Sequence, residues 1–193
     1  MSRPAPTDPA APARWTAEEY LALVDRGVLG PDDRVELLEG VIVSMAPHNV
    51  PHAAGVGRVE NALHRAIGDR AVVRVQLSLP LGAHSVPEPD AMILPGPIEN
   101  YDHAHPTTAL LVVEVADSSL KQDRLTKRAI YAAAGILDYW IVNLPDACVE
   151  VRRTPEPETR RYKNVSIFRR GDTLEVAALP GVRIAVSDLL PSK

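Results

Sequence analysis

The stretch "LLVVEVADSSLKQDRLTKRAIYAAAGILDYWIVN", residues 110–143, carries more information about the fold than any other part of the chain. It begins with an apolar run, which is typical of a strand that is buried on both faces. Glu114 interrupts this run. A carboxylate at the end of a buried strand is costly unless it is paired, hydrogen-bonded or bound to a metal. Glu114 is therefore either a satisfied structural group or a ligand.

The segments around this stretch predict one mixed sheet. After Glu114, a helix capped by Ser118 or Ser119 is expected to end at Gly135, and the strand "DYWIVN" follows it. The other expected elements are a helix with a capping box at Thr16 and Glu19, a hairpin at Glu39-Gly40, a helix over 52–69, strands over 71–81 and 88–94, and short C-terminal strands. Helices do not alternate with every strand, so we expect an α/β (α+β) fold with a central mixed β-sheet flanked by α-helices.

Length and composition place the chain among ordinary globular proteins. Its 193 residues suit one domain, so we expect residues 1–14 to be a disordered lead-in rich in Pro and Ala, and residues 15–193 to form a single domain. The single cysteine, Cys148, suggests a reducing compartment. No apolar run is long enough to span a membrane and no signal peptide is visible, so we expect a cytoplasmic protein with no membrane partner. Phosphate-binding glycine motifs are absent from the sequence, which leaves nucleotide binding without support.

Two further carboxylates stand in or beside predicted strands, where burial of a charge is costly. Asp90 comes immediately before an apolar strand run, and Glu36 lies within the predicted strand "RVELLE". If neighbouring strands bring Asp90 and Glu114 to one sheet edge, their charges repel unless a cation holds them. Oxygen ligands are what Mg²⁺ prefers, with Mn²⁺ as a substitute. A zinc site is disfavoured, because Cys148 stands alone and the histidines lack ligand spacing.

A phosphodiester-cleaving site usually also needs a cationic group near the attacked phosphate. The strand position that shares the face of Glu114 is Ala116, so a lysine is missing from the strand. Asp123, Lys127 and Tyr131 have the spacing of one helical stripe, from which Lys127 could reach Glu114. The alternative is a surface ion pair between Asp123 and Lys127. Tyr131 is expected to be a packing group.

Basic residues gather between positions 151 and 170, although the net charge of the chain is −4. This window holds seven basic and two acidic residues. It is either a solvated surface of the sheet or a face that contacts phosphates. The candidate nucleic-acid contacts are Arg152, Arg153, Arg160 and Arg161.

The chain resembles the bacterial Uma-two family of "putative restriction endonucleases", a branch of the PD-(D/E)XK nuclease superfamily. The resemblance covers nearly all of the chain after Arg14 and is strongest over residues 110–143. It also rests on "WTAEEYLAL", "RVELLEGVIVSMAP" with His52 after it, "VRVQ" and "PEPD". It implies the restriction-endonuclease-like fold with extra C-terminal strands.

The resemblance also implies a site and an activity. The implied catalytic residues are Glu36, Asp90, Glu114 and Lys127, with Asp90 and Glu114 as ligands of Mg²⁺ or Mn²⁺ and Glu36 as a third ligand, and with Gln76 and Asp123 as accessory residues. The implied function is metal-dependent hydrolysis of DNA by a homodimer. Two alternatives stay open: an inactive module with the nuclease fold that binds nucleic acid or a protein, and a hydrolase of small phosphodiesters.

Overall fold

A six-stranded sheet forms the centre of the computed structural model, which describes residues 14–30, 32–46 and 49–191. In spatial order, its strands are β3 (Val72–Arg74), β4 (Ala91–Leu94), β5 (Leu111–Ala116), β6 (Asp138–Asn143), β7 (Cys148–Glu156) and β8 (Arg161–Arg169). The β5–β6 pair is parallel and the other neighbouring pairs are antiparallel. The predicted mixed sheet is therefore confirmed. The predicted lead-in falls outside the described residues, except for Arg14.

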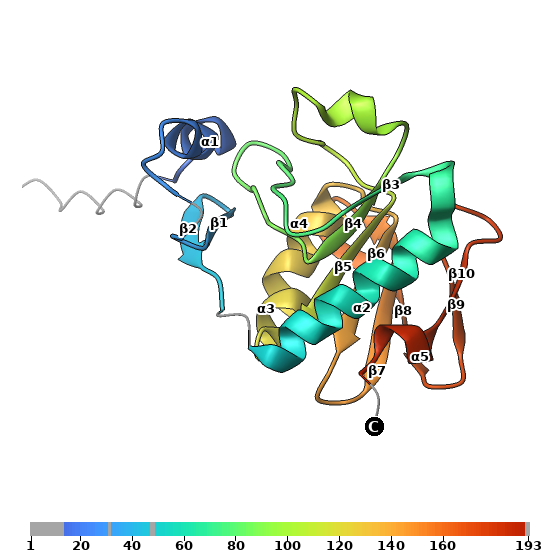
Figure 1. Cartoon of the computed structure of the whole chain (residues 1–193). Coiled ribbons are helices and arrows are strands. Elements are labelled where there is room, and N and C mark those ends of the chain that lie inside the picture. Colours follow the sequence, from blue (N-terminus) through green and yellow to red (C-terminus); the bar gives the residue numbers. More distant parts are fainter. Residues whose placement is uncertain (1–13, 31, 47–48, 192–193) are drawn as a thin grey trace, which may run out of the picture.

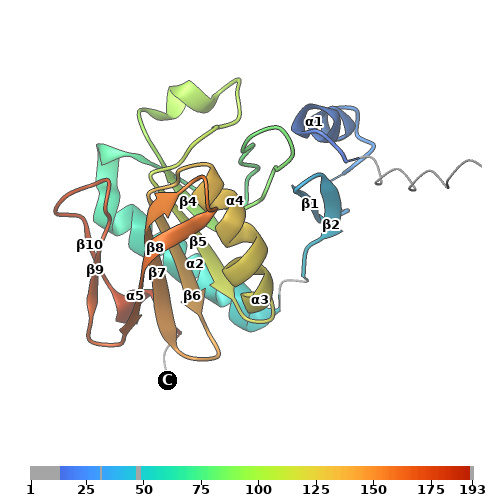
Figure 2. The same cartoon turned by 180° about the vertical axis from the view of Figure 1, so that it is seen from behind.

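Helices cover both faces of this sheet (Figures 1 and 2). Helix α2 (Val50–Ile67) lies on one face, together with α5 (Val186–Leu189) and the hairpin of β9 (Thr173–Glu175) and β10 (Arg183–Ala185). The other face is covered by the crossover between the two parallel strands, which consists of α3 (Leu120–Gln122), the π-helical turn η3 (Asp123–Lys127) and α4 (Arg128–Ala133). The short 3₁₀ turns η1 (Gly68–Arg70) and η2 (Ile98–Tyr101) complete the helical elements.

Alternation along β5 assigns its side chains to the two faces. Val113 and Val115 pack in the core beneath α2, whereas Val112 and Ala116 pack in the core beneath α4. Side chains two positions apart share a face of a strand. Glu114 is therefore directed to the side of the crossover helices, where its partners lie.

The N-terminal part of the described chain lies beside the sheet, and Figure 1 shows it set off from the main body. It comprises α1 (Ala17–Asp25) and the hairpin of β1 (Val35–Leu38) and β2 (Val41–Ser44). The predicted capping box of α1 and the turn at Glu39-Gly40 are both confirmed. The Tyr20 hydroxyl donates to the Val35 carbonyl at 2.8 Å and links α1 to the hairpin.

One local prediction was wrong, and one predicted helix has a feature that was not expected. The strand expected over residues 71–81 ends at Arg74, because Gln76 has a φ of 49° and this left-handed backbone cannot continue a strand. The helix expected after Ser119 contains a π-helical turn, in which the Arg128 amide donates to the Asp123 carbonyl. Single-turn π-bulges inside α-helices occur frequently at functional sites.

Candidate active site

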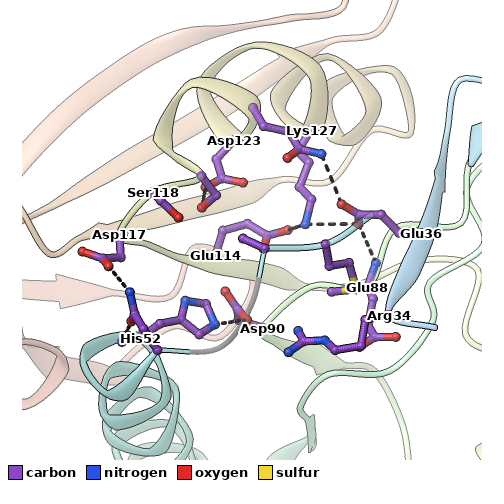
Figure 3. Close-up of a pocket in the computed structure, with 15 residues that line it drawn as sticks. Arg34, Glu36, His52, Glu88, Asp90, Glu114, Asp117, Ser118, Asp123 and Lys127 are labelled. Carbon is purple, nitrogen blue, oxygen red and sulfur yellow. Dashed lines mark hydrogen bonds and ion pairs between the residues drawn. The ribbon is translucent and has the colours of Figure 1, made fainter. Parts of the chain in front are cut away.

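The four predicted catalytic residues surround one cavity of about 50 Å³ at the end of β5 (Figure 3). Each comes from a different element: Glu36 from β1, Asp90 from the residue before β4, Glu114 from β5 and Lys127 from η3. A volume of about 50 Å³ exceeds what one water molecule needs, roughly 10–15 Å³. The cavity therefore has room for an ion or a few water molecules.

Glu114 is held by two buried donors. Its side chain is buried, and its Oε1 atom accepts a hydrogen bond from the Tyr131 hydroxyl at 2.6 Å and one from Lys127 Nζ at 3.1 Å. Burial raises the pKa of Glu114 well above its ordinary value, and the charge of Lys127 opposes that rise. Among the described residues no hydrogen-bond donor contacts Oε2.

Lys127 joins carboxylates from two different sheets. Its ammonium lies 3.1 Å from Glu114 Oε1 and 3.2 Å from Glu36 Oε2. Burial alone would lower the pKa of Lys127, but the charges of Glu114 and Glu36 raise it above its ordinary value. The lysine is therefore a fixed cation at neutral pH, and Figure 3 shows it reaching between the two carboxylates.

Glu36 is held by two further donors. Its Oε2 atom accepts from the Glu88 amide at 3.2 Å, and its Oε1 atom accepts from Gln122 Nε2 at 3.3 Å. These contacts connect β1 both to the loop before β4 and to α3. The N-terminal hairpin thereby supplies one wall of the cavity.

Asp90 is positioned by β5 and by α2. Its Oδ2 atom accepts a hydrogen bond from the Val115 amide at 2.8 Å, and its Oδ1 atom lies 3.2 Å from His52 Nε2. The other ring nitrogen of His52 lies 2.9 Å from the Val115 carbonyl. The hydrogen bond to Asp90 raises the pKa of His52 against the effect of its burial. His52 therefore bridges Asp90 to the backbone of β5.

The two expected accessory residues have different positions. Asp123 lines the cavity and is buried, and its Oδ2 atom accepts from Ser119 Oγ at 2.7 Å. Burial raises the pKa of Asp123 to about 6. The alternative of a surface ion pair with Lys127 is wrong, because both side chains are buried and the ammonium of Lys127 pairs with Glu114 and Glu36. Gln76 lies outside the cavity and lines the groove next to it.

Sequence reasoning missed three contributors. Tyr131 was expected to be a packing group, although its spacing from Lys127 already placed it on the same stripe. His52 was assigned no role, because the histidines as a set lack the ligand spacing of a zinc site. Glu88 lies within "PEPD" and carried no separate signal, but it lines the cavity, and burial raises the pKa of its carboxyl group.

The four candidate arginines do not form one free basic face. Arg152 is buried and pairs with Glu150 at 2.8 Å, and Arg153 pairs with the buried Asp138 at 3.0 Å. Arg160 pairs with Glu39 across the surface, whereas Arg161 is exposed at the start of β8. Phosphate contact stays a prediction for these residues, and Arg161 is the best placed of the four.

The donor set of the cavity suits a hard divalent cation. Six carboxylates line it against two permanent cations, Arg34 and Lys127; the carboxylates are those of Glu36, Glu88, Asp90, Glu114, Asp117 and Asp123. Within the described ranges, no three His, Cys, Asp or Glu side chains are already arranged as a metal centre. The excess of carboxylate oxygens and the uncontacted Oε2 of Glu114 fit an oxygen-preferring ion such as Mg²⁺ or Mn²⁺.

The fold has counterparts among known proteins. Residues 17–187 match the Uma2 family, which is described as "Putative restriction endonuclease". The chain belongs to this family. No match was found among the curated proteins.

A solved structure confirms the architecture of this Uma2 member. It is the crystal structure of "a putative nuclease belonging to DUF820" from Anabaena variabilis ATCC 29413, and the TM-score is 0.71 at 18% identity. The match covers 91% of this chain and 97% of that chain. The restriction-endonuclease-like fold is thus shown over nearly the whole length of both chains. None of the described helices is both long enough and apolar enough to cross a membrane.

Proposed function

We propose that this Uma2 protein is a divalent-metal-dependent DNA endonuclease with a site formed by Glu36, Asp90, Glu114 and Lys127. The observation that carries the proposal is the convergence of three buried carboxylates and one buried lysine from four elements on a single cavity. Buried charges are costly and are retained where paired or functional. Family membership supports the same reaction class.

The residues of the chain have distinct roles in this proposal. Asp90 and Glu114 would hold Mg²⁺ or Mn²⁺, with Glu36 as the third carboxylate. A bound divalent ion supplies Lewis acidity toward a phosphoryl oxygen and lowers the pKa of water. Lys127 stabilises negative charge that develops on the phosphate, because it is a cation fixed beside Glu114.

Two further side chains orient the ligands. Tyr131 fixes the rotamer of Glu114 through its hydroxyl, and His52 fixes that of Asp90. Such supporting contacts commonly tune metal affinity about 10- to 100-fold. We also propose that the protein acts as a homodimer, because cutting both strands of a duplex calls for two sites and two-fold dimers are the commonest assemblies.

The test is cleavage of a supercoiled plasmid with Mg²⁺ or Mn²⁺, with and without a chelator. Asp90→Asn and Glu114→Gln should each lower the rate by about 10²–10³-fold or more, the scale for removing one preorganised group. The matched control is Asp188→Asn. Asp188 lies on α5, is exposed and pairs with Arg65 of α2, and neither residue lines the cavity. This substitution should leave the rate unchanged.

Metal binding provides an independent readout. Mn²⁺ should raise the melting temperature of the wild type through linkage, and the two site variants should lose this rise. The outcome for an inactive module with the nuclease fold is different. Such a module would bind DNA equally well with and without a chelator, and Mn²⁺ would leave its melting temperature unchanged.

A further inference from the structure

A larger groove of about 620 Å³ opens directly beside the carboxylate cavity. It lies between the N-terminal elements α1 and β1 and the irregular segment after β3. The cavity and the groove share Arg34, Met45 and Glu88 in their linings, so the two are adjacent. We propose that this groove takes an unstacked nucleobase adjacent to the phosphodiester at the carboxylate site. The inference rests on the proposed nuclease function.

The lining of the groove suits a flat heteroaromatic ring. Apolar side chains come from α1, the loop after it and the hairpin, and they include Val24, Leu29 and Val35. Polar groups that can hydrogen-bond the edge of a base come from the opposite wall and include Gln76 and Ser78. Sites for small ligands are typically apolar with a few placed polar groups and have volumes of about 300–1,000 Å³.

The charges of the groove argue for a base and against a row of phosphates. Among the described residues, its lining contains one cation, Arg34, and one carboxylate, Glu88, and both also line the cavity. A track for several phosphates would need several cations. Arg34 can contact the phosphate at the junction, while the neutral base occupies the remainder of the groove.

The backbone of the groove is strained at two positions. Six non-glycine residues of the described chain have a positive φ, and four of them lie in the turns or within the antiparallel ladders of β1–β2, β6–β7 and β7–β8. The other two are Arg34, with φ 43°, and Gln76, with φ 49°, and both line this groove. Such conformations cluster at ligand clamps and active sites.

This geometry implies a preference among nucleic-acid substrates. In a duplex the bases are stacked inside, so a base reaches a side pocket only after it leaves the stack. That step costs least for unpaired or single-stranded substrates. The chain should therefore cut single-stranded or locally unpaired DNA faster than a matched duplex.

The experiment compares initial cleavage rates on one oligonucleotide as a single strand and as a matched duplex, using the full chain with Mn²⁺. The wild type should favour the single strand by about tenfold or more, the scale of one stacked base. Val24→Trp fills the groove from α1, where Val24 is 42% exposed, and should bring this ratio toward one by slowing single-strand cleavage. Val165→Trp, at an exposed position on β8, is the matched control and should keep the wild-type ratio.

A second variant tests the groove independently, in case Val24→Trp does not fold. Gln76→Gly suits the left-handed backbone, removes the amide and should also lower the ratio. Equal wild-type rates on the two substrates, or an unchanged ratio in both groove variants, would overturn the groove assignment and leave the nuclease proposal intact. Absence of metal-dependent cleavage on either substrate would overturn the nuclease proposal, and this inference with it.

Discussion

Lys127 Nζ lies 3.1 Å from Glu114 Oε1, across the end of β5, and the same ammonium lies 3.2 Å from Glu36 Oε2. One buried cation thus ties the central sheet to the N-terminal hairpin. The lysine stands on a π-helical turn, whereas the related sequence pattern PD…(D/E)xK would place it on the strand at Ala116. The helix therefore supplies the charge that the strand lacks.

Replacing Lys127 with methionine should destabilise the fold as well as the reaction. The substitution leaves two buried carboxylates without their shared cation, and breaking a buried pair in this way costs about 3–5 kcal/mol. Urea denaturation at pH 7 measures this loss. Lys121→Met is the control, because Lys121 is exposed at the start of the same helix and its loss should cost no more than about 0.5 kcal/mol. Equal stability of the two variants would show that the Lys127 pairs contribute nothing.

Tyr131→Phe should weaken metal binding and leave the cavity otherwise intact. The lost hydroxyl donates to Glu114 Oε1 at 2.6 Å, and a hydrogen bond to a charged group contributes about 1.5–3 kcal/mol. Tyr139→Phe is matched to it, since Tyr139 is equally buried but donates to the Asp123 carbonyl at 3.1 Å. The Mn²⁺ concentration at the midpoint of the thermal shift should rise for Tyr131→Phe alone. If both variants shift alike, Tyr131 has no special relation to the metal.

The sequence was informative about the site where the signal was local. The break of an apolar run at Glu114 predicted a buried carboxylate, and alternation along the strand predicted that Ala116 leaves the lysine position empty. Helical spacing then showed that Lys127 could reach Glu114, with a surface ion pair to Asp123 as the alternative. Each of these inferences uses only neighbours along one strand or one helix, so periodicity could supply them.

The missed features depend on contacts between distant segments. Nothing near His52 in sequence indicates that it meets Asp90 and the Val115 carbonyl, 38 and 63 positions further along. The π-helical turn has no marker in "DRLTK", and the contact of its Asp123 carbonyl with Tyr139 comes from a residue 16 positions further along. The early end of β3 depends on one left-handed residue, Gln76, which alternation of apolar residues cannot detect.

The arginines between 152 and 161 should separate into two classes when they are replaced. Arg153→Ala leaves the buried carboxylate of Asp138 short of its ion-pair partner, so it should cost about 3–5 kcal/mol of stability. Arg161→Ala should leave stability within about 0.5 kcal/mol of the wild type, because Arg161 is exposed. Its effect should appear in DNA binding, where loss of one phosphate contact lowers the slope of log affinity against log salt by about 1. An unchanged slope would remove Arg161 from the interface.

Asp123→Asn should stabilise the protein at neutral pH but not in acid. Burial raises the pKa of Asp123 from 3.8 to about 6, so the folded state binds more protons than the unfolded state between these values. Stability is therefore lost as the pH rises through this window, and the ionised form costs about 3 kcal/mol above pH 6. Asparagine has no charge to desolvate, and its amide oxygen can still accept from Ser119 Oγ. The difference in unfolding free energy between variant and wild type should thus grow from near zero at about pH 4 to about 3 kcal/mol at about pH 7.

Urea titrations at both pH values measure this difference. The control is Asp188→Asn, which removes an exposed carboxylate that pairs with Arg65, and its stability difference should not grow with pH. A variant that is less stable than the wild type at neutral pH would mean that the ionised Asp123 carboxylate stabilises the site, through Lys127, by more than its burial costs.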